Sequence, residues 1–283
     1  AFYALGAYGA AILGTQHDVP PGVILVLMPI LGFVVGLVLA PPLVRTRGLH
    51  FAVATLAIGI IASDILDNWV SVTRGPLGIG GVRRPGPISL LGVELDITTQ
   101  HGYFGFVVVM LGLSLVIATL YHRSRVARVL VASRDDELLA TSIGFGVVRY
   151  RIFAFALTSA VGSFAGVLYA WYILYVSPPP FSFFASSFEV FVFVAVGGAG
   201  TIWGPAIGAI GLTVLPELLD VEPYDKRIVY GAILLGVTLF LSRGVAPTIA
   251  DLPHKLRDLV GRRSNQPGEG AAAPDRRTEA VGR

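Results

Sequence analysis

Four long stretches without Asp, Glu, Lys or Arg constrain this 283-residue chain more than any other feature. They cover residues 19–44, 97–122, 152–188 and 190–216. A helix needs about 20 mainly apolar residues to cross a hydrocarbon core of about 30 Å. With 54% hydrophobic and 14% charged residues, the chain is predicted to be a polytopic membrane protein. This class excludes soluble enzymes, nucleic-acid binders and disulfide-stapled secreted domains.

Apolar segments bounded by charges and turn residues predict an all-α membrane bundle of about eight spans. Helices are expected because backbone groups cannot stay unpaired in lipid and the segments show no strand alternation. The chain begins inside an apolar run without Met, so we expect some N-terminal residues to be missing. The predicted spans are residues 2–14, 23–44, 50–66, 102–121, 152–174, 188–200, 204–219 and 228–242.

Basic residues are divided unequally between the connections. Sixteen of the 21 Lys and Arg lie in residues 45–49, 122–151 and 243–283. Cytoplasmic loops of membrane proteins carry an excess of Lys and Arg. These three connections are therefore predicted to be cytoplasmic, and residues 67–101 and 220–227 to lie outside.

Two short apolar segments, 188–200 and 204–219, are joined by a Gly/Pro-rich connection. A thirteen-residue helix is about 20 Å long, too short to cross the hydrocarbon core. Discontinuous helices of this kind often line the pathway of a transporter, but a tight hairpin of tilted helices fits equally well. The glycines predicted to line a pathway or to pack closely are Gly197, Gly198, Gly200 and Gly204.

Pairs of small residues four positions apart predict close helix packing elsewhere in the bundle. Such pairs occur at Gly32/Gly36 and Gly162/Gly166. Without a side chain, these positions let helices approach closely in lipid. Packing inside the bundle and contact with another subunit both fit the pattern.

The connection 122–151 contains a predicted helix of about ten residues. A serine is its expected N-cap, and three carboxylates would occupy the first turn, at the positive end of the helix dipole. Leucines provide an apolar side, and a glycine is expected to end the helix. These residues are Ser133, Asp135, Asp136, Glu137, Leu138, Leu139 and Gly144. From the residues alone, a surface helix and a helix that docks on a partner protein both fit.

Motifs of several functional classes are absent from the sequence. There is no P-loop sequence, so the chain cannot itself be a P-loop ATPase. It has no Cys and no His-Glu-x-x-His spacing, so no metal site is expected. An intramembrane enzyme would need a nucleophile and a base within the spans, and a proton-coupled carrier needs deep ionisable groups. Only Asp64 and Glu189 approach such positions, each near a predicted helix end.

A series of motifs, in order along nearly the whole chain, resembles the permease subunits of branched-chain amino acid ABC importers, in particular the LivM-like branch. They are ALGAYGA (4–10), RTRGLHFAVATLA (45–57), TRGPLGI (73–79), SRVAR, RDDE and IG within 124–144, VGGAGTIWGP (196–205) and LPE (215–217). Each motif is modest alone, but their order and their consistent membrane sides are specific.

This resemblance implies a transport subunit of the bacterial inner membrane, with the helix at 134–144 docking on a cytoplasmic ATPase. The residues that it assigns to coupling are Asp135, Asp136, Glu137, Leu138, Leu139 and Gly144. The implied partners are a second permease subunit, two ATPase subunits that bind ATP and Mg, and an extracytoplasmic solute-binding protein. No cofactor in this chain and no nucleic acid are expected. Branched-chain amino acids are the implied solute; urea, short amides and other amino acids are alternatives, and a stand-alone secondary carrier is a less favoured function.

The chain is therefore expected to have three parts. Residues 1–242 would form the permease domain. Residues 243–263 are predicted to form a basic amphipathic segment on the anionic inner leaflet. Residues 264–283 are too polar and too rich in Gly, Pro and Arg to bury a core, so a disordered cytoplasmic C-terminus is expected.

Overall fold

The computed structural model describes residues 1–218 and Gly231, except residues 47, 87, 91, 92, 96 and 199. These residues belong to two compact units, which divide between Val192 and Phe193. Apart from Gly231, the predicted eighth span at 228–242 and the predicted segments 243–263 and 264–283 lie outside the described residues.

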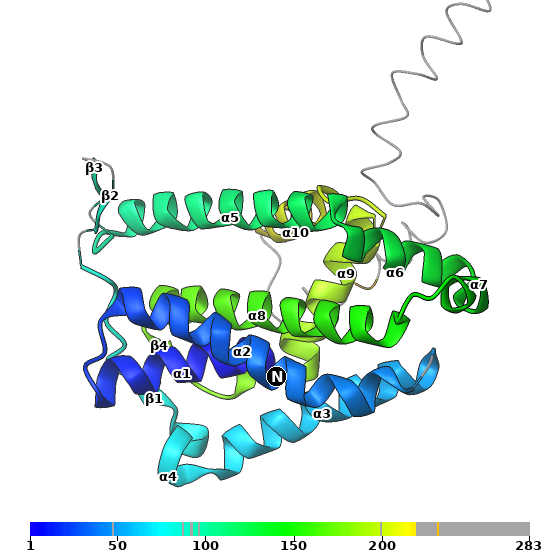
Figure 1. Cartoon of the computed structure of the whole chain (residues 1–283). Coiled ribbons are helices and arrows are strands. Elements are labelled where there is room, and N and C mark those ends of the chain that lie inside the picture. The colour runs from blue at the N-terminus through cyan, green and yellow to red at the C-terminus, as the bar shows by residue number, and fades with distance from the viewer. Residues whose placement is uncertain are drawn as a thin grey trace, which may run out of the picture. The chain divides into compact units, whose positions relative to one another are not determined.

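Three helices form the centre of the first unit and lie side by side (Figure 1). They are α1 (Phe2–Gln16), α2 (Pro21–Val44) and α8 (Val147–Ile173). Helices α1 and α2 both pack along α8. Helix α8 is therefore the axis of this unit.

Small residues bring these three backbones together. A Cβ added at Gly6 would overlap the carbonyl oxygen of Ser163, and one added at Gly32 would lie 2.6 Å from the Ser163 Cβ. The buried Ser163 hydroxyl donates a hydrogen bond of 2.8 Å to the carbonyl of Met28. A Cβ at Gly166 would overlap a carbonyl of α1. Close packing within the bundle is thus confirmed for Gly32 and Gly166.

Two further long helices, α3 (Leu49–Asn68) and α5 (Gln100–Arg123), are far less buried. Of the twenty residues of α3, all described, Leu66 alone is buried. In α5 the buried residues are Tyr103 and Phe106. Both helices carry many exposed large apolar side chains, which suit a lipid or protein environment rather than water.

Four helices in the described part of the chain are long and apolar enough to cross a membrane: α2, α3, α5 and α8. Helices α1, α9 (Phe188–Gly197) and α10 (Gly204–Leu218) are shorter. The chain is therefore a multi-pass helical membrane protein, and the count of eight spans stays a prediction.

The connections of the first unit gather at two opposite ends (Figure 1). One end carries Arg45, Thr46 and Gly48, α6 (Arg125–Asp135) and α7 (Glu137–Ser142). We call it the inner end, following the predicted topology, and the opposite end the outer end. The structure thus brings the described residues of 45–49 and the connection 122–151 to one side, as the distribution of basic residues predicts.

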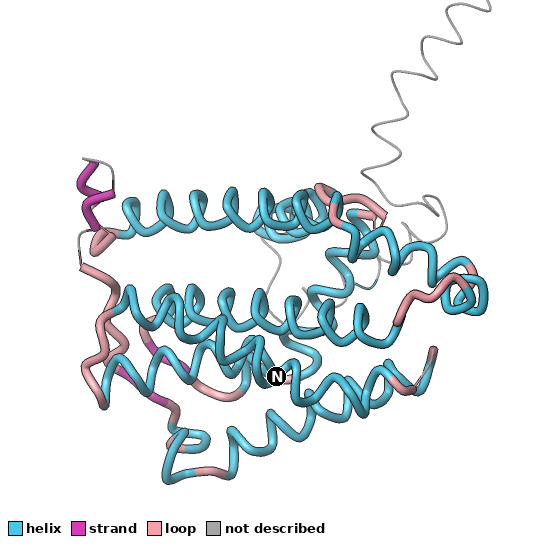
Figure 2. Tube along the Cα trace, viewed as in Figure 1, coloured by secondary structure: helices cyan, strands magenta, loops and turns pink. Residues whose placement is uncertain are grey.

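Short strands occur at the outer end, which the all-α prediction did not include (Figure 2). Strand β1 (Ile79–Gly80) pairs antiparallel with β4 (Tyr175–Val176), and β2 (Ile88–Leu90) pairs antiparallel with β3 (Val93–Leu95). The other short elements are α4 (Val70–Thr73), the 3-10 helices η1 (Gly75–Leu77) and η2 (Pro179–Phe181), and the π-helix η3 (Phe183–Ser187). Two- and three-residue strands have too little pattern to be recognised in the sequence.

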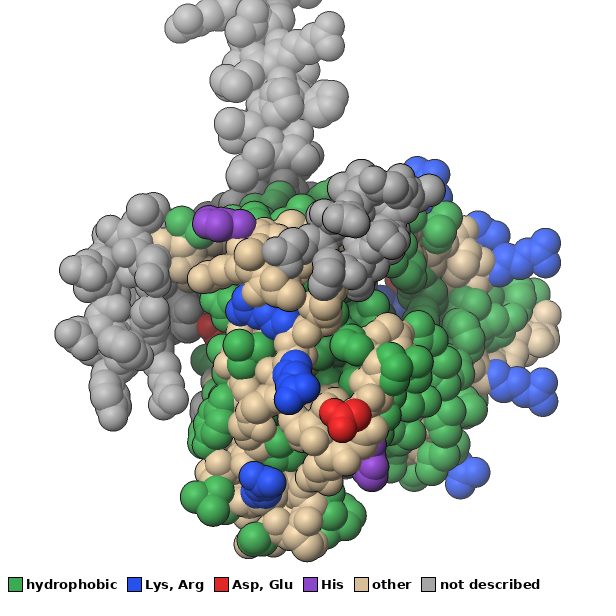
Figure 3. All heavy atoms as spheres, turned by 90° about the vertical axis from the view of Figure 1, so that its left-hand side faces the viewer, with side chains coloured by type: hydrophobic (Ala, Val, Ile, Leu, Met, Phe, Trp, Pro, Cys, Tyr) green, Lys and Arg blue, Asp and Glu red, His purple; other side chains and the backbone are tan. Residues whose placement is uncertain are grey.

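Figure 3 looks onto the outer end. Charged and His side chains are scattered there among polar atoms, whereas hydrophobic side chains cover most of the surface beside it. The exposed charged and His residues of this end include His17, Asp18, Asp67, Arg74, Arg83 and His101. This division is expected where apolar helix flanks meet lipid and the helix ends meet water.

Candidate functional site

At the inner end, two helices connect α5 to α8, where the sequence predicts one. Helix α6 begins after Ser124, whose hydroxyl accepts a hydrogen bond from the Ala127 N–H at 3.3 Å. The predicted N-cap, Ser133, lies inside α6, where its hydroxyl donates to the carbonyl of Leu130 at 2.9 Å. The predicted start of the helix is therefore wrong, because Ser124 starts an earlier helix that continues to Asp135.

Helix α7 is short and closed at both ends. The carboxylate of Asp136 accepts a hydrogen bond of 3.0 Å from the N–H of Leu139, so Asp136 is the N-cap. At the other end, Gly144 has a φ of +93°, and the Phe145 N–H donates to the carbonyl of Ala140 at 3.3 Å. This is a Schellman-type end, which requires the left-handed backbone that glycine adopts readily. Gly144 ends the helix as predicted, but α7 has six residues rather than about ten.

Large apolar side chains are exposed on and just after α7. Leu138 is 83% exposed, Leu139 58%, Ile143 66% and Phe145 42%. We call these four residues the α7 apolar surface. They lie beside the exposed carboxylates of Asp135 and Asp136, which are unfavourable in lipid. Such a patch on a short projecting helix is typical of a protein contact site.

The third predicted carboxylate, Glu137, is turned the other way. The Arg151 guanidinium in α8 donates to both of its oxygens, at 3.3 Å and 3.1 Å. The two side chains are only 28% and 23% exposed. Glu137 therefore connects α7 to α8. From the sequence alone, the same role is predicted for all three carboxylates.

This ion pair lies in the wall of a cavity of about 880 Å³ between the start of α3, α6 and α8. Its lining mixes aromatic and aliphatic side chains with hydroxyl and charged groups. The polar residues of the lining are Thr46, Thr55, Ser133, Arg134, Glu137, Arg151 and Thr158. The inner end thus contains open space beside the element that joins α7 to the bundle.

The glycine-rich connection joins two helices whose backbones touch closely. A Cβ at Gly197 would overlap the carbonyl oxygen of Gly204, and one at Gly208 would overlap the carbonyl oxygen of Phe193. Side chains at these positions would push α9 and α10 apart. Close packing of these two glycines is thus shown within this part of the chain, and it fits both of the predicted alternatives.

The other two predicted glycines have different surroundings. Gly198 has a φ of +108°, a conformation that side chains disfavour. Its carbonyl accepts from the hydroxyl of Thr201 at 3.2 Å, which closes the turn. A Cβ at Gly200 would meet nothing within 4 Å. Lining of a transport pathway by these glycines stays a prediction.

At the outer end, the TRGPLGI segment folds into a tight turn. The buried Thr73 hydroxyl donates to the carbonyl of Leu66 at 2.7 Å and accepts from the Gly75 N–H at 3.1 Å. Gly75 and Gly78 have φ of +55° and +64°. A Cβ at Gly78 would overlap the carbonyl oxygen of Val176. Gly78 thus allows this segment to lie against β4, and Gly75 allows it to lie against the end of α3.

Arg84 fastens the outer end of α8. Its guanidinium donates to the carbonyls of Trp171, Tyr172 and Thr98 at 3.2, 3.5 and 3.4 Å. It also lies 5.1 Å from the centre of the Tyr103 ring, at cation–π distance. A cation at the last carbonyls of a helix is favourable, so Arg84 ties α8 to the start of α5.

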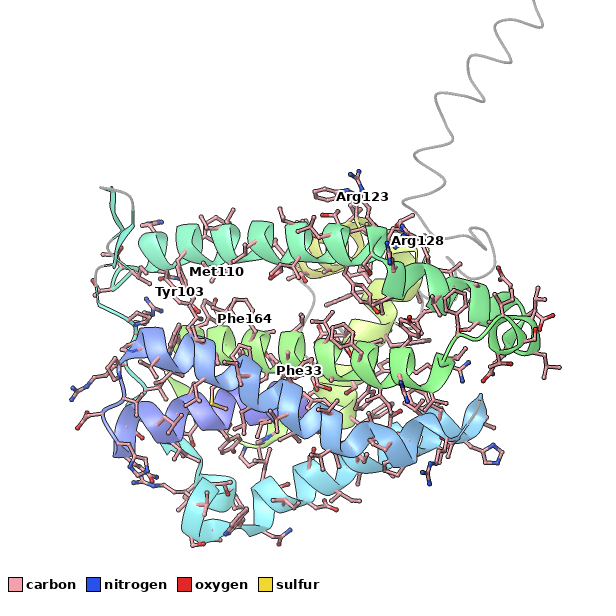
Figure 4. The ribbon with its side chains drawn as sticks, in the orientation of Figure 1. Phe33, Tyr103, Met110, Arg123, Arg128 and Phe164 are labelled. Atoms are coloured by element: carbon pink, nitrogen blue, oxygen red, sulfur yellow. The ribbon has the colours of Figure 1, made fainter. Side chains whose placement is uncertain are left out.

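Between α5 and α8, aromatic side chains occupy the outer half of the interface. Tyr103 and Met110 of α5 point toward α8, and Phe164 of α8 points toward α5 (Figure 4). The Tyr103 hydroxyl donates to the carbonyl of Leu168. A cavity of about 460 Å³ opens here, lined by Gln100, His101, Tyr103, Phe104, Val107, Leu168, Tyr169 and Tyr172.

Within the described residues, no three His, Asp or Glu side chains gather as a metal site requires. The described features instead suit a helical membrane subunit with a projecting contact helix. A family of permease components of branched-chain amino acid transport systems matches the chain over residues 1–238. The chain belongs to this family.

Several known proteins are similar in sequence to this chain. The high-affinity branched-chain amino acid transport system permease protein LivM of Salmonella typhimurium is 30% identical, covering 87% of this chain and 62% of its own length. A LivM protein of Methanocaldococcus jannaschii is 26% identical, covering 73% and 58%. The autoinducer 2 import system permease protein LsrC of Salmonella paratyphi B is 26% identical, covering 67% and 62%. The chain thus spans about three fifths of these relatives, and no solved structure matches it.

Sequence reasoning missed the contacts made by two arginines. In the sequence, Arg151 is one of several basic residues that flank the predicted helix. Arg84 is one of the few basic residues of the connection 67–101, which is predicted to lie on the outer side of the membrane. A weak signal existed for Arg151, because it directly adjoins the apolar run 152–188, where a charged side chain is favoured by a partner. No local signal connects Arg84 to carbonyls 87 and 88 positions away.

Proposed function

We propose that the protein is the transmembrane permease subunit of an ATP-driven importer for branched-chain amino acids. The observation that carries this proposal is the family match, which extends over residues 1–238. The arrangement of long apolar helices around α8 supports it. The solute is inferred from the printed names of the LivM relatives.

The proposal gives the α7 apolar surface a role. In an importer of this kind, a cytoplasmic ATPase must contact the permease where ATP-driven motion can reach the spans. Helix α7 offers exposed leucines on a rigid, capped helix between α6 and α8. Asp136, Glu137, Leu138, Leu139 and Gly144 form or hold this helix, and Asp135 ends α6 beside it. The ATPase subunits would bind ATP and Mg, and this chain would bind neither.

The proposed complex contains a second permease subunit, two cytoplasmic ATPase subunits and an extracytoplasmic solute-binding protein. The exposed flanks of α3 and α5 leave ample apolar surface for a second permease subunit and for lipid. In the predicted topology the inner end and the C-terminus face the cytoplasm of a bacterial cell, and the outer end faces the binding protein.

Uptake by the assembled importer in proteoliposomes tests the proposal. With ATP enclosed beside the ATPase subunits and the solute-binding protein on the opposite side, we expect uptake of labelled leucine. Valine and isoleucine should compete, and urea and acetamide should not. Uptake that needs an ion gradient but no ATP would overturn the proposal in favour of a secondary carrier. ATP-driven uptake of urea or acetamide alone would reassign the solute.

A further inference from the structure

Helix α7 reaches α8 through a short loop. Residues 143–146 lie between the two helices, and two of them are glycines. Gly144 has a left-handed backbone, and nothing lies within 4 Å of the position of its Cβ. Because glycine has no Cβ, it adopts left- and right-handed backbone conformations at little steric cost. Through this connection alone, a displacement of α7 would be taken up by the loop.

The ion pair between Glu137 and Arg151 bridges this loop. Glu137 is the first residue of α7, and Arg151 is the fifth residue of α8. Two parallel contacts, at 3.1 Å and 3.3 Å, fix the direction of both side chains as well as their distance. Because both side chains are about three quarters buried, this pair is screened by solvent less than a surface pair.

Beyond Arg151, α8 continues directly into the packed core. Ala156 and Ser159 are buried two turns further along the helix. A Cβ at Gly36 of α2 would lie 2.6 Å from the Cβ of Ser159. Closely packed backbones move together because their contacts cannot be compressed. A displacement of the first turns of α8 is therefore passed to α2.

Helix α7 has two sides with different contacts: the α7 apolar surface on one and the ion pair with Arg151 on the other. Leu138 and Leu139 are exposed to a partner, and Glu137 faces the protein's own α8. We propose that the Glu137–Arg151 pair is a positioning pair, which makes α7 and α8 one rigid unit and so transmits ATPase motion to the bundle. This inference rests on the proposed importer function.

A double-mutant cycle in the assembled importer tests the pair. The variants are Glu137→Gln, Arg151→Gln and both together, with Arg149→Gln as the matched control. Arg149 is exposed two positions away and forms no ion pair among the described residues. The measurements are ATPase co-purification, ATP hydrolysis stimulated by the solute-loaded binding protein, and solute transported per ATP.

We expect each single variant to lower transport per ATP by about fivefold or more, a usual size for coupling between sites. The double variant should be no worse than the more impaired single variant, because a pair can be broken only once. Arg151→Lys keeps the charge and should recover at least part of the loss. Co-purification and the Arg149→Gln variant should match the parent.

Three results would overturn the positioning role. These are unchanged transport per ATP in the single variants, losses that multiply in the double variant, and loss of ATPase binding in Glu137→Gln alone. The last would place Glu137 in the contact with the ATPase. The proposed function fails separately, if the parent importer shows no ATP-driven uptake.

Discussion

The two ends of the first unit are held together by different kinds of contact. At the outer end, Arg84 and Thr73 bond to backbone carbonyls, and β1 pairs with β4. At the inner end, a six-residue helix is joined to α8 by a glycine-containing loop and one ion pair, beside a cavity of about 880 Å³. Backbone carbonyls move only when the helix itself moves, whereas side-chain pairs can shift. The outer end is thus held by contacts to the backbone, and under the proposed function the inner end is the one that a partner would move.

The largest expected effect tests whether the inner end is a contact surface. Leu138→Asp combined with Leu139→Asp should abolish co-purification of the ATPase subunits and ATP-driven uptake. Both side chains are mostly exposed, so the permease itself should still insert and fold. Leu77→Asp is the matched control, because Leu77 is 78% exposed at the outer end and should retain ATPase binding. Normal ATPase binding by the Leu138/Leu139 double variant would remove the contrast between the two ends.

The second prediction compares one glycine from each end. Gly78→Ala and Gly144→Ala both place a side chain on a left-handed backbone, which costs about 1–2 kcal/mol. At Gly78 the added Cβ would also overlap the Val176 carbonyl, whereas at Gly144 it would meet open space. Overpacking adds about 1–3 kcal/mol, so Gly78→Ala should lower the thermal midpoint in detergent more. Equal shifts in the two variants would show that the outer end is no more rigid than the inner end.

The third prediction concerns the fastening of α8 at the outer end. Arg84→Ala removes three bonds to carbonyls and the contact with the Tyr103 ring. Hydrogen bonds to charged groups contribute about 1.5–3 kcal/mol to stability, and partial exposure reduces this, so we expect a loss of about 2 kcal/mol. Arg83→Ala is the control, because Arg83 is exposed and forms no hydrogen bond or ion pair among the described residues. Similar thermal midpoints for the two variants would contradict the fastening role.

The parts of this structure that the sequence predicts are those with local causes. Long apolar runs predict α2, α3, α5 and α8, because each run is by itself long and apolar enough to cross the hydrocarbon core as a helix. Gly144 predicts the end of α7, because few other residues adopt a left-handed backbone. Ser133 is misread because serines cap helices but also occur inside them, bonded to the preceding turn.

Contacts between distant segments could not be predicted. Glu137 and Arg151 are 14 positions apart, and Arg84 lies 87 positions from Trp171. The sequence shows that these residues are charged, but the choice of partner depends on how the helices pack. For the same reason, the three carboxylates near the start of α7 look equivalent in the sequence, although one caps the helix, one pairs with α8 and one is exposed.

The smallest expected effect separates these carboxylates. Asp136→Ala removes the cap of α7, since its carboxylate accepts the Leu139 N–H, and should cost about 0.5–2 kcal/mol of local helix stability. Asp135→Ala should cost far less, because Asp135 is exposed and forms no hydrogen bond or ion pair through its side chain among the described residues. Hydrogen exchange of the α7 amides measures this directly: faster exchange is expected in Asp136→Ala and parental exchange in Asp135→Ala. Asp136→Asn retains an oxygen acceptor and should restore most of the protection.

If the α7 amides exchange equally fast in the parent and in Asp136→Ala, helix α7 is not stabilised by its cap. Its rigidity would then come from Glu137 and Arg151, and the ion pair would be the main element that makes the inner end a single unit.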